Sequence, residues 1–243
     1  KLAGVVIPDS VERVGVDAFN DCESLASAKI GCKTIDEGAF HGCTGLTNVV
    51  FGSRVTHIAD AAFMDCESLA SVDIPENVEG VMENTFLGCK GLTSVKIARG
   101  TIGANAFSGC VNLRSVQFGK RVTLISDSAF MDCEKLESVA IPASVVHIGK
   151  DAFEACGSLK SAQIESQVIG VSAFNGCTSL ETVRLGGEVK TISDYAFDGC
   201  EKLTSIVIPA AVKTLDGNTF LGCSGLQKIE VDQGNPHFSS ADG

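Results

Sequence analysis

The stretch AFMDCESLASVDIP, residues 62–75, returns further along the chain as AFMDCEKLESVAIP, residues 129–142. Both copies contain a shorter pattern, in which two residues separate Phe from Cys and two more separate Cys from Leu. The phenylalanines of its ten copies are Phe19, Phe40, Phe63, Phe86, Phe107, Phe130, Phe153, Phe174, Phe197 and Phe220. Only two spacings occur between them, as from Phe19 to Phe40 and from Phe40 to Phe63. Ten copies in phase identify an internal repeat.

Each repeat continues with apolar residues at fixed positions after the leucine. In the quoted copy these are Leu69, Val72 and Ile74, which form the L-x-x-L-x-L pattern of leucine-rich repeats, and the period also fits. The alternation of apolar and polar residues predicts a strand with one buried face. The predicted fold is therefore a leucine-rich repeat solenoid, a right-handed superhelix of the α/β type with mostly short parallel strands, in ten coils of 21–23 residues.

A longer period explains why the quoted stretch recurs. One short spacing and two long ones follow each other in a fixed order, and Ile-Pro recurs in step with them, at residues 7–8, 74–75, 141–142 and 208–209. A 67-residue unit of three coils has thus been duplicated in tandem.

The rest of the coil predicts two further segments. An apolar pair such as Val55 and Ile58 indicates a shorter extended segment on the opposite wall. The Ala-Phe turn after it is expected to form a 3₁₀ or single-turn helix that directs Phe into the core. We expect one solenoid domain over residues 1–230, and the start of a truncated non-repeat segment at 231–243.

Composition and charge exclude several classes of function. The formal net charge is −11, which disfavours nucleic acid and anionic membrane surfaces as partners. No apolar run is long enough to insert into a membrane, and the N-terminal stretch KLAGVVIPDS has no signal peptide. We expect a monomer.

The cysteines follow the repeat. Ten of the eleven occur once per coil: Cys22, Cys43, Cys66, Cys89, Cys110, Cys133, Cys156, Cys177, Cys200 and Cys223. A fixed place in every coil predicts a column of reduced, buried, small apolar side chains. Disulfides between coils are feasible by distance, but parallel Cβ vectors disfavour them. Cys32 aligns with Arg99 and Ser166, and is expected in an exposed turn as the one reactive thiol.

Neither a metal site nor an active site is expected. The four histidines are scattered, and the acidic pairs beside Cys66 and Cys133 lie three coils apart, about 14 Å by strand spacing. Those pairs fit solvated turns better than a calcium site. No catalytic or phosphate-binding motif occurs, so we expect no enzyme activity and no cofactor.

Function is expected where the repeat does not dictate the residue type. The strand position before the second apolar residue is Ser or Thr in eight of ten coils, which predicts a hydroxyl ladder. The next exposed position varies, and solenoids use such columns as concave binding surfaces. The candidate binding residues, long and polar, are Asp73, Lys96, Gln117, Gln163 and Arg184. Asp73 and Lys96 could pair across strands. The alternative is that all five simply solvate the sheet.

The pattern I-P-x-x-V-x-x-I-x-x-x-A-F-x-x-C-x-x-L-x-x-V-x-I, clear from Ile141 to Ile164, resembles the BspA-like leucine-rich repeat over essentially the whole chain. The tail VDQGNPHFSSADG resembles that family's non-repeat segment. The resemblance implies a secreted or wall-attached surface protein of mucosal anaerobic bacteria or protozoa. Members are described as adhesins for host matrix proteins or other microbes, and no ligand residues carry over.

Three functions are therefore open. The first is a non-catalytic extracellular adhesion module that engages a protein or glycan partner through its concave face. The others are a structural spacer of a larger surface protein and a targeting module of a surface-attached hydrolase.

Overall fold

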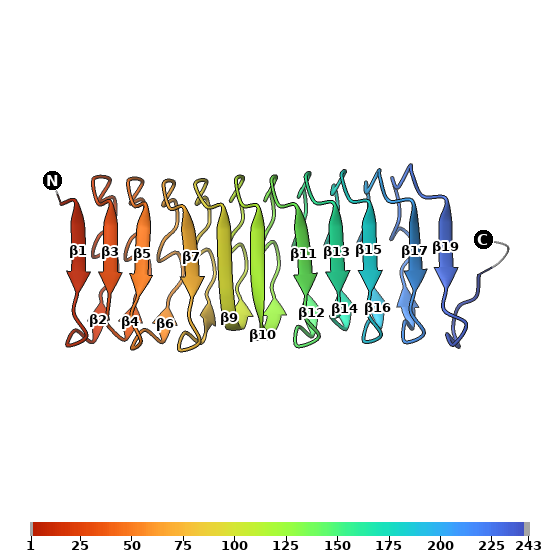
Figure 1. Cartoon of the computed structure of the whole chain (residues 1–243), viewed down its shortest axis with the longest axis horizontal. Coiled ribbons are helices and arrows are strands. Elements are labelled where there is room, and N and C mark those ends of the chain that lie inside the picture. The colour runs from red at the N-terminus through yellow and green to blue at the C-terminus, as the bar shows by residue number, and fades with distance from the viewer. Residues whose placement is uncertain (1, 241–243) are drawn as a thin grey trace.

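The computed structural model describes residues 2–240 and confirms a solenoid of parallel strands (Figure 1). Eleven longer strands form one row: β1 (Gly4–Ile7), β3 (Ser27–Ile30), β5 (Asn48–Phe51), β7 (Ser71–Ile74), β9 (Ser94–Ile102), β10 (Ser115–Ile125), β11 (Ser138–Ile141), β13 (Ser161–Ile164), β15 (Thr182–Leu185), β17 (Ser205–Ile208) and β19 (Lys228–Val231). Eight two-residue strands form the opposite wall: β2 (Arg13–Val14), β4 (Thr34–Ile35), β6 (His57–Ile58), β8 (Gly80–Val81), β12 (His147–Ile148), β14 (Val168–Ile169), β16 (Thr191–Ile192) and β18 (Thr214–Leu215). Strands β9 and β10 are long enough to continue from the first row into the second.

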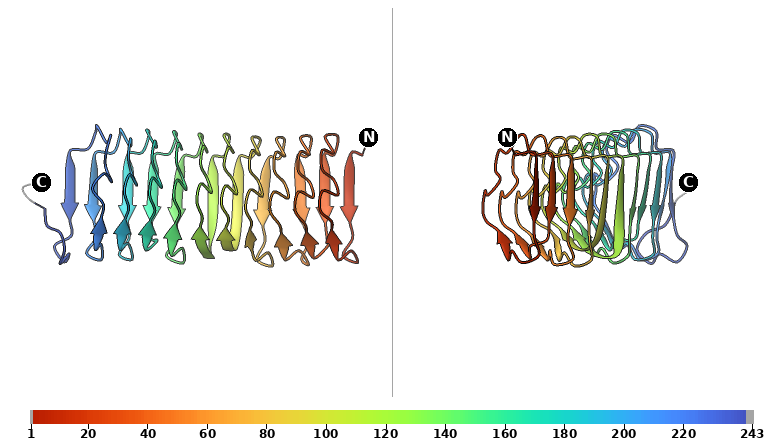
Figure 2. Two further views of the ribbon diagram at one scale, coloured as in Figure 1. Left: turned by 180° about the vertical axis from the view of Figure 1, so that it is seen from behind. Right: turned by 60° about the vertical axis from the view of Figure 1, so that its left-hand side comes forward.

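The row of longer strands is nearly straight and twists gradually along the chain (Figures 1 and 2). No strong concavity is visible on it, so we call the outward surface of these eleven strands the strand face. Inward residues such as Val72 and Ile74 are buried, and outward residues such as Ser71 and Asp73 are exposed, as the alternation predicts.

A continuous stack of phenylalanine rings fills the centre of the solenoid. Nine successive pairs of repeat Phe rings lie with centroids 4.9–5.9 Å apart and planes within 9° of parallel. Eight of the ten rings are fully buried, and only Phe19 and Phe220 in the end coils are partly exposed. Each large ring thus removes apolar surface from water against two neighbours.

The turn that carries each Phe contains no helix, which corrects the expected 3₁₀ or single-turn element. None of residues 2–240 is helical. In nine of the ten coils the residues two before and two after Phe instead have left-handed φ values, for example Ala61 at 52° and Asp65 at 56° around Phe63. A left-handed residue on either side of Phe interrupts any right-handed helix.

This geometry directs backbone amides toward the next coil. The Phe63 amide donates to the Thr85 carbonyl at 2.9 Å, and the Asp65 amide to the Leu87 carbonyl at 2.8 Å. Equivalent bonds recur from coil to coil along the chain. We call this wall the Phe-turn ladder. It gives buried backbone groups the partners that they need.

The strand face, by contrast, is interrupted once in every three-coil unit. Its strands pair as β1-β3-β5, β7-β9-β10, β11-β13-β15 and β17-β19, with no ladder between these groups. We call the three interruptions, β5|β7, β10|β11 and β15|β17, the joints. The Phe-turn ladder crosses all three, because the amides of Phe40, Phe107 and Phe174 each donate to the next coil at 2.8 Å. The three-coil duplication is therefore a physical unit of the fold.

A change of side chain marks each joint. The fourth residue of the longer strand is a fully buried Ile in most coils, but a partly exposed Phe51, Phe118 or Leu185 before a joint. The rings of Phe51 and Phe118 pack edge-on against Phe63 and Phe130 of the following coil, both at 5.7 Å. The Phe51 and Phe118 rings lie between one coil and the next. In other coils the smaller Ile side chain at this position leaves room there for strand pairing.

The left-handed turn residues give a prediction about stability. Ala155 has a φ of 57°, a conformation that most other coils assign to Gly or Asp at this position. A left-handed alanine costs about 1–2 kcal/mol, and glycine removes this cost but loses more backbone entropy on folding. We therefore expect Ala155→Gly to stabilise the protein by roughly 0.5–1 kcal/mol. Urea denaturation measures the effect.

The matched control is Ala152→Gly, three residues earlier. Ala152 is fully buried and its φ is not left-handed, so this change should destabilise the fold. If both variants lose stability alike, the left-handed turn is not a source of strain.

Candidate functional site

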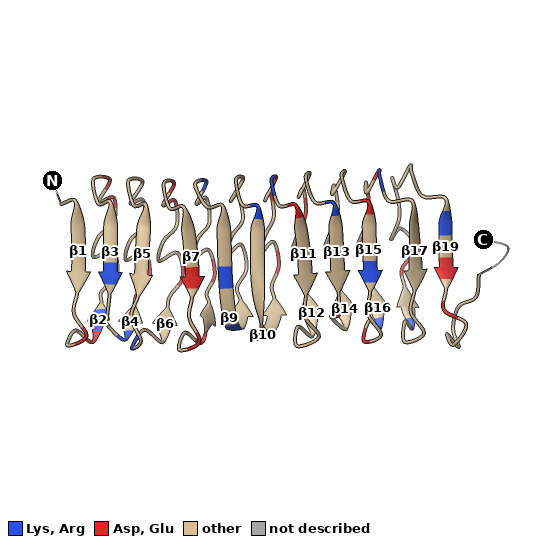
Figure 3. Cartoon of the chain, viewed as in Figure 1, with Lys and Arg blue, Asp and Glu red and all other residues tan. Residues whose placement is uncertain are grey.

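The five candidate binding residues all lie exposed in the middle of the strand face. Asp73 is in β7, Lys96 in β9, Gln117 in β10, Gln163 in β13 and Arg184 in β15. Figure 3 shows a negatively charged band on β7 and positively charged bands on β9 and β15. Asp73, Lys96 and Gln117 are register neighbours, and so are Gln163 and Arg184. The β10|β11 joint separates the two groups.

The pair expected across β7 and β9 is present. Lys96 Nζ lies 3.3 Å from Asp73 Oδ2, with the two side chains 58% and 65% exposed. An exposed pair of this kind contributes about 0–1 kcal/mol. Its consequence is local: the two charges cancel, which leaves this part of the face nearly neutral.

The second group keeps its charge. Gln163 Nε2 donates to Glu165 Oε1 at 3.3 Å, while Arg184 has no ion-pair partner among residues 2–240. The guanidinium is a fixed set of N–H donors that stays protonated in proteins. Arg184 is therefore available to a ligand.

Each group borders a shallow hollow in the strand face. The smaller one, of about 230 Å³, lies over β7, β9 and β10 and is lined by Asp73, Lys96 and Gln117. The larger one, of about 510 Å³, runs from β10 to β15 and includes Gln163 and Arg184. Ala140 of β11 lies in this second hollow, between Gln117 and Gln163 in the column. We call this larger hollow the Ala140 hollow.

Ala140 was not predicted as a site residue. It gave no signal as a functional side chain, because its contribution is the space that a longer residue would fill. The signal lay in the column itself, where Ala140 is the shortest residue among long neighbours.

The hydroxyls beside this column are exposed and free. Ser115, Ser138, Ser161 and Thr182 line the Ala140 hollow, and none of their hydroxyls makes a hydrogen bond within the described chain. They form a row of unpartnered donors and acceptors and not a bonded ladder.

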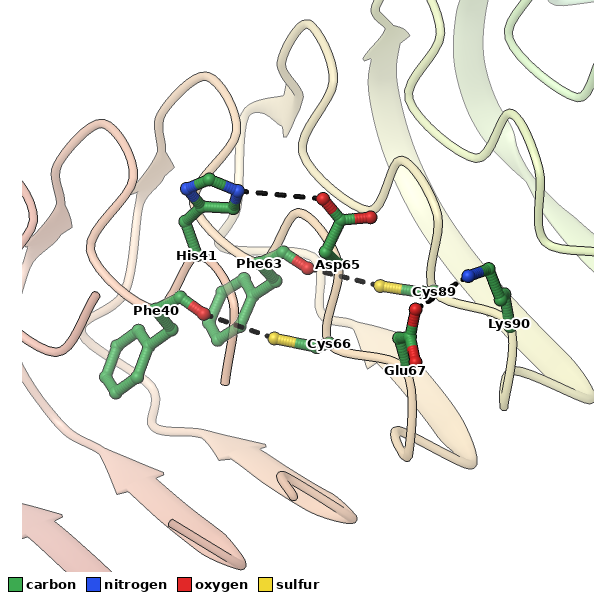
Figure 4. A network of polar contacts seen from close by, with 8 residues as sticks. All are labelled: Phe40, His41, Phe63, Asp65, Cys66, Glu67, Cys89 and Lys90. Carbon is green, nitrogen blue, oxygen red and sulfur yellow. Dashed lines mark hydrogen bonds and ion pairs between the residues drawn. The ribbon is translucent and has the colours of Figure 1, made fainter. Parts of the chain in front are cut away.

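The repeat cysteines are free thiols, and all but Cys22 donate a hydrogen bond to a carbonyl. Nine of them donate S–H to the Phe carbonyl of the preceding coil, at 3.0–3.4 Å. Figure 4 shows Cys66 with Phe40 and Cys89 with Phe63. The Phe40 carbonyl also accepts the Cys43 amide at 3.3 Å, so both of its lone pairs have partners. The sequence predicted the buried column but not these bonds.

Burial raises the pKa of several buried column thiols, to about 11 for Cys43 and about 12 for Cys110. Removal of water is the largest cause in both, because a thiolate is poorly solvated there. Eight column cysteines are buried, whereas Cys22 and Cys223 in the end coils are only partly so. The column is a set of structural thiols, not of nucleophiles.

The prediction for Cys32 was wrong. Cys32 is fully buried, and its thiol donates to the Thr34 carbonyl at 3.2 Å. Its counterpart Ser166 is buried in the same way and donates to the Val168 carbonyl. In these short coils the turn places this side chain inside the solenoid, so Cys22 and Cys223 are the least protected thiols.

Of the acidic pairs beside Cys66 and Cys133, the first is engaged by neighbouring coils. Asp65 Oδ2 lies 3.6 Å from His41 Nε2, and Glu67 Oε1 lies 2.6 Å from Lys90 Nζ (Figure 4). Within residues 2–240, no group of three or more His, Cys, Asp or Glu side chains is placed to hold a metal ion. These carboxylates serve contacts between coils.

Comparison with known proteins identifies the family. The model for the BspA type leucine rich repeat region, in six copies, matches residues 1–101, 93–169 and 165–240. The chain belongs to this family. Among curated proteins none matches it. No helix in the described part is long and apolar enough to cross a membrane.

Several solved structures are similar to this chain. A leucine-rich repeat protein from Bacteroides ovatus is 25% identical, with a TM-score of 0.57 over 95% of this chain and 81% of that one. A leucine rich cell surface protein from Faecalibacterium prausnitzii is 28% identical, with a TM-score of 0.48 over 100% and 83%. A leucine-rich repeat protein from Eubacterium ventriosum is 17% identical, with a TM-score of 0.47 over 93% and 82%.

The cysteine column gives a prediction about alkaline pH. An unfolded thiol ionises near pH 8.5, whereas Cys43 and Cys110 hold their protons to about pH 11 and 12 in the fold. Above pH 8.5 the unfolded chain binds fewer protons, so the free energy of unfolding falls by about 1.4 kcal/mol per pH unit for each such thiol. Urea titrations from pH 7.5 to 10.5 under reducing conditions measure this slope.

Cys110→Ser is the matched variant, since its hydroxyl keeps a donor for the Phe86 carbonyl but does not titrate. It should make the fall in the free energy of unfolding smaller by about 1.4 kcal/mol per pH unit, the contribution of one thiol. An unchanged slope would show that Cys110 does not hold its proton in the fold.

Proposed function

We propose that this chain is a non-catalytic binding module that engages a macromolecular partner through its strand face. The observation that supports this most directly is that the residues of each coil that stabilise the fold are not those that point outward on the strand face. The Phe stack, the cysteine column and the Phe-turn ladder stabilise the solenoid from the inside and from one wall. The outward residues of the strand face take no part in these contacts and border two hollows. Solenoids present such surfaces to partners.

The partner that we propose is an extracellular protein or glycan, bound by a monomeric module at a cell surface or in a secreted protein. The family resemblance in the sequence supports this location and an adhesive role. The formal net charge of −11 speaks against nucleic acid.

A structural spacer is the second candidate, and the unbroken Phe stack favours it. Nine stacked pairs connect the coils without interruption, as a stiff rod requires. A spacer, or a module that targets an attached hydrolase, would need no ligand at Arg184.

A binding screen against matrix proteins, mucins and glycans tests the proposal. A partner found in it should lose about tenfold or more in affinity on combined Lys96→Ala and Arg184→Ala substitution, as interface anchors of more than about 1 kcal/mol do. Both side chains are exposed, so the melting temperature should stay unchanged.

The matched control is combined Lys33→Ala and Lys213→Ala, which removes the same charge beside the two-residue strands. It should leave the affinity unchanged. Equal losses in both double variants, or full affinity without Lys96 and Arg184, would contradict the strand-face assignment. A screen without any partner would favour the spacer.

A further inference from the structure

The Ala140 hollow exists for two reasons that coincide at one place on the strand face. The column residue of β11 is Ala140, and β11 does not pair with β10 across the joint. Val116 of β10 is consequently only partly buried, whereas its counterparts Val95 and Val139 are buried. At the other two joints, Asp73 and Val207 occupy the place of Ala140. Asp73 lines the smaller hollow of about 230 Å³, and Val207 borders a separate hollow that extends toward the C-terminal segment.

The lining of this hollow suits a chain of hydroxyl groups. Ser115, Ser138, Ser161 and Thr182 offer one unpartnered hydroxyl per strand, and strands in a sheet are about 4.8 Å apart. Each hydroxyl both donates and accepts. A glycan chain that lies across the strands presents ring hydroxyls in similar density.

An extended peptide fits the same row poorly. Its residues rise about 3.3 Å each, so side chains on one face recur near about 6.6 Å, out of step with the strands. Protein interfaces also depend on buried aromatic or apolar anchors, and the apolar side chains accessible in this lining are only Ala140 and the partly buried Val116. Shape and chemistry therefore favour the glycan.

The charges on the strand face narrow the class of glycan further. The outward positions of the strand face carry four cations and two anions: Lys29, Lys96, Arg184, Lys228, Asp73 and Glu230. Lys96 pairs with Asp73, and Lys228 with Glu230. Arg184 and Lys29 remain unpaired within the described chain, and only Arg184 lines the hollow. A guanidinium binds a carboxylate through two parallel hydrogen bonds.

We propose that the Ala140 hollow is the binding site of a carboxylate-bearing glycan. The glycan lies across β10 to β15, and the Arg184 guanidinium binds a sugar carboxylate. Ring hydroxyls bond to the free serine and threonine hydroxyls, and the Gln163 amide borders the chain. This inference rests on the proposed binding function and specifies its ligand.

Calorimetry with three probes tests it on the whole chain. The first is a hexasaccharide of alternating glucuronate and N-acetylglucosamine, the second is the same sugar with its carboxylates reduced to alcohols, and the third is a hexaglutamate peptide. The carboxylated sugar should bind, and the other two should bind at least about tenfold more weakly, because hydrogen bonds to charged groups contribute about 1.5–3 kcal/mol.

Two pairs of variants locate the site. Arg184→Gln should weaken binding of the carboxylated sugar about tenfold or more, while Lys29→Gln, the unpaired cation outside the hollow, should not. Ala140→Gln should fill the hollow and abolish binding, since Gln already occupies this column in β10 and β13. Val207→Gln, at the same position one three-coil unit later, should change nothing. The melting temperatures of all four should match that of the parent.

Each other outcome overturns the inference. Equal binding of the reduced sugar would exclude the carboxylate contact, and stronger binding of the peptide would exclude the glycan. Unchanged binding by Ala140→Gln would exclude this hollow. If no sugar binds but the screen yields a protein partner sensitive to Lys96 and Arg184, the glycan is wrong and the proposed function stands.

Discussion

The carbonyl oxygen of each repeat phenylalanine is the acceptor on which the solenoid depends. It lies in the interior, where a polar group without a partner is costly. In nine of the ten coils, an amide within the same coil and the cysteine thiol of the next coil both bind it, as Cys43 and Cys66 do at Phe40. Because the second donor comes from the next coil, each coil completes the one before it. This requirement explains why Phe and Cys recur together, and why the left-handed turn residues around them are needed to direct the amides outward.

Stabilising the coils through the Phe turns has a consequence on the other side of the molecule. The strand face does not need to be a continuous sheet, and it is interrupted at the three joints while the Phe-turn ladder continues across them. Its outward side chains are then free to vary, which is where a binding surface can develop without loss of the fold. The hollow beside Ala140 lies at one of these joints, so the duplication of a three-coil unit and the position of the proposed ligand are physically connected.

The sequence predicts the fold almost completely and the site only in part. Ten in-phase phenylalanines and the alternation around Leu69, Val72 and Ile74 are sufficient for a leucine-rich solenoid, because each position has one role that every coil repeats. The Ala-Phe turn was expected to be helical, whereas hydrogen bonds to the next coil hold Ala61 and Asp65 in left-handed conformations. The alignment placed Cys32 outside, because a shortened coil changes which way a turn residue points. The Asp73–Lys96 pair followed from register, but the hollow at Ala140 depends on strand separation at a joint, which the alternation of residues within a coil does not predict.

Amide hydrogen exchange tests most directly whether the Phe turns, and not the strands, hold the coils together. The amides of Phe40, Phe107 and Phe174 cross the joints, and those of Phe63 and Phe130 lie within units. We predict equally slow exchange for all five, since each donates to the neighbouring coil. The strands that follow a joint, such as β11, should exchange faster than strands inside a unit, such as β13. If β11 is as protected as β13 while Phe107 exchanges quickly, the strand sheet and not the Phe-turn ladder carries the fold.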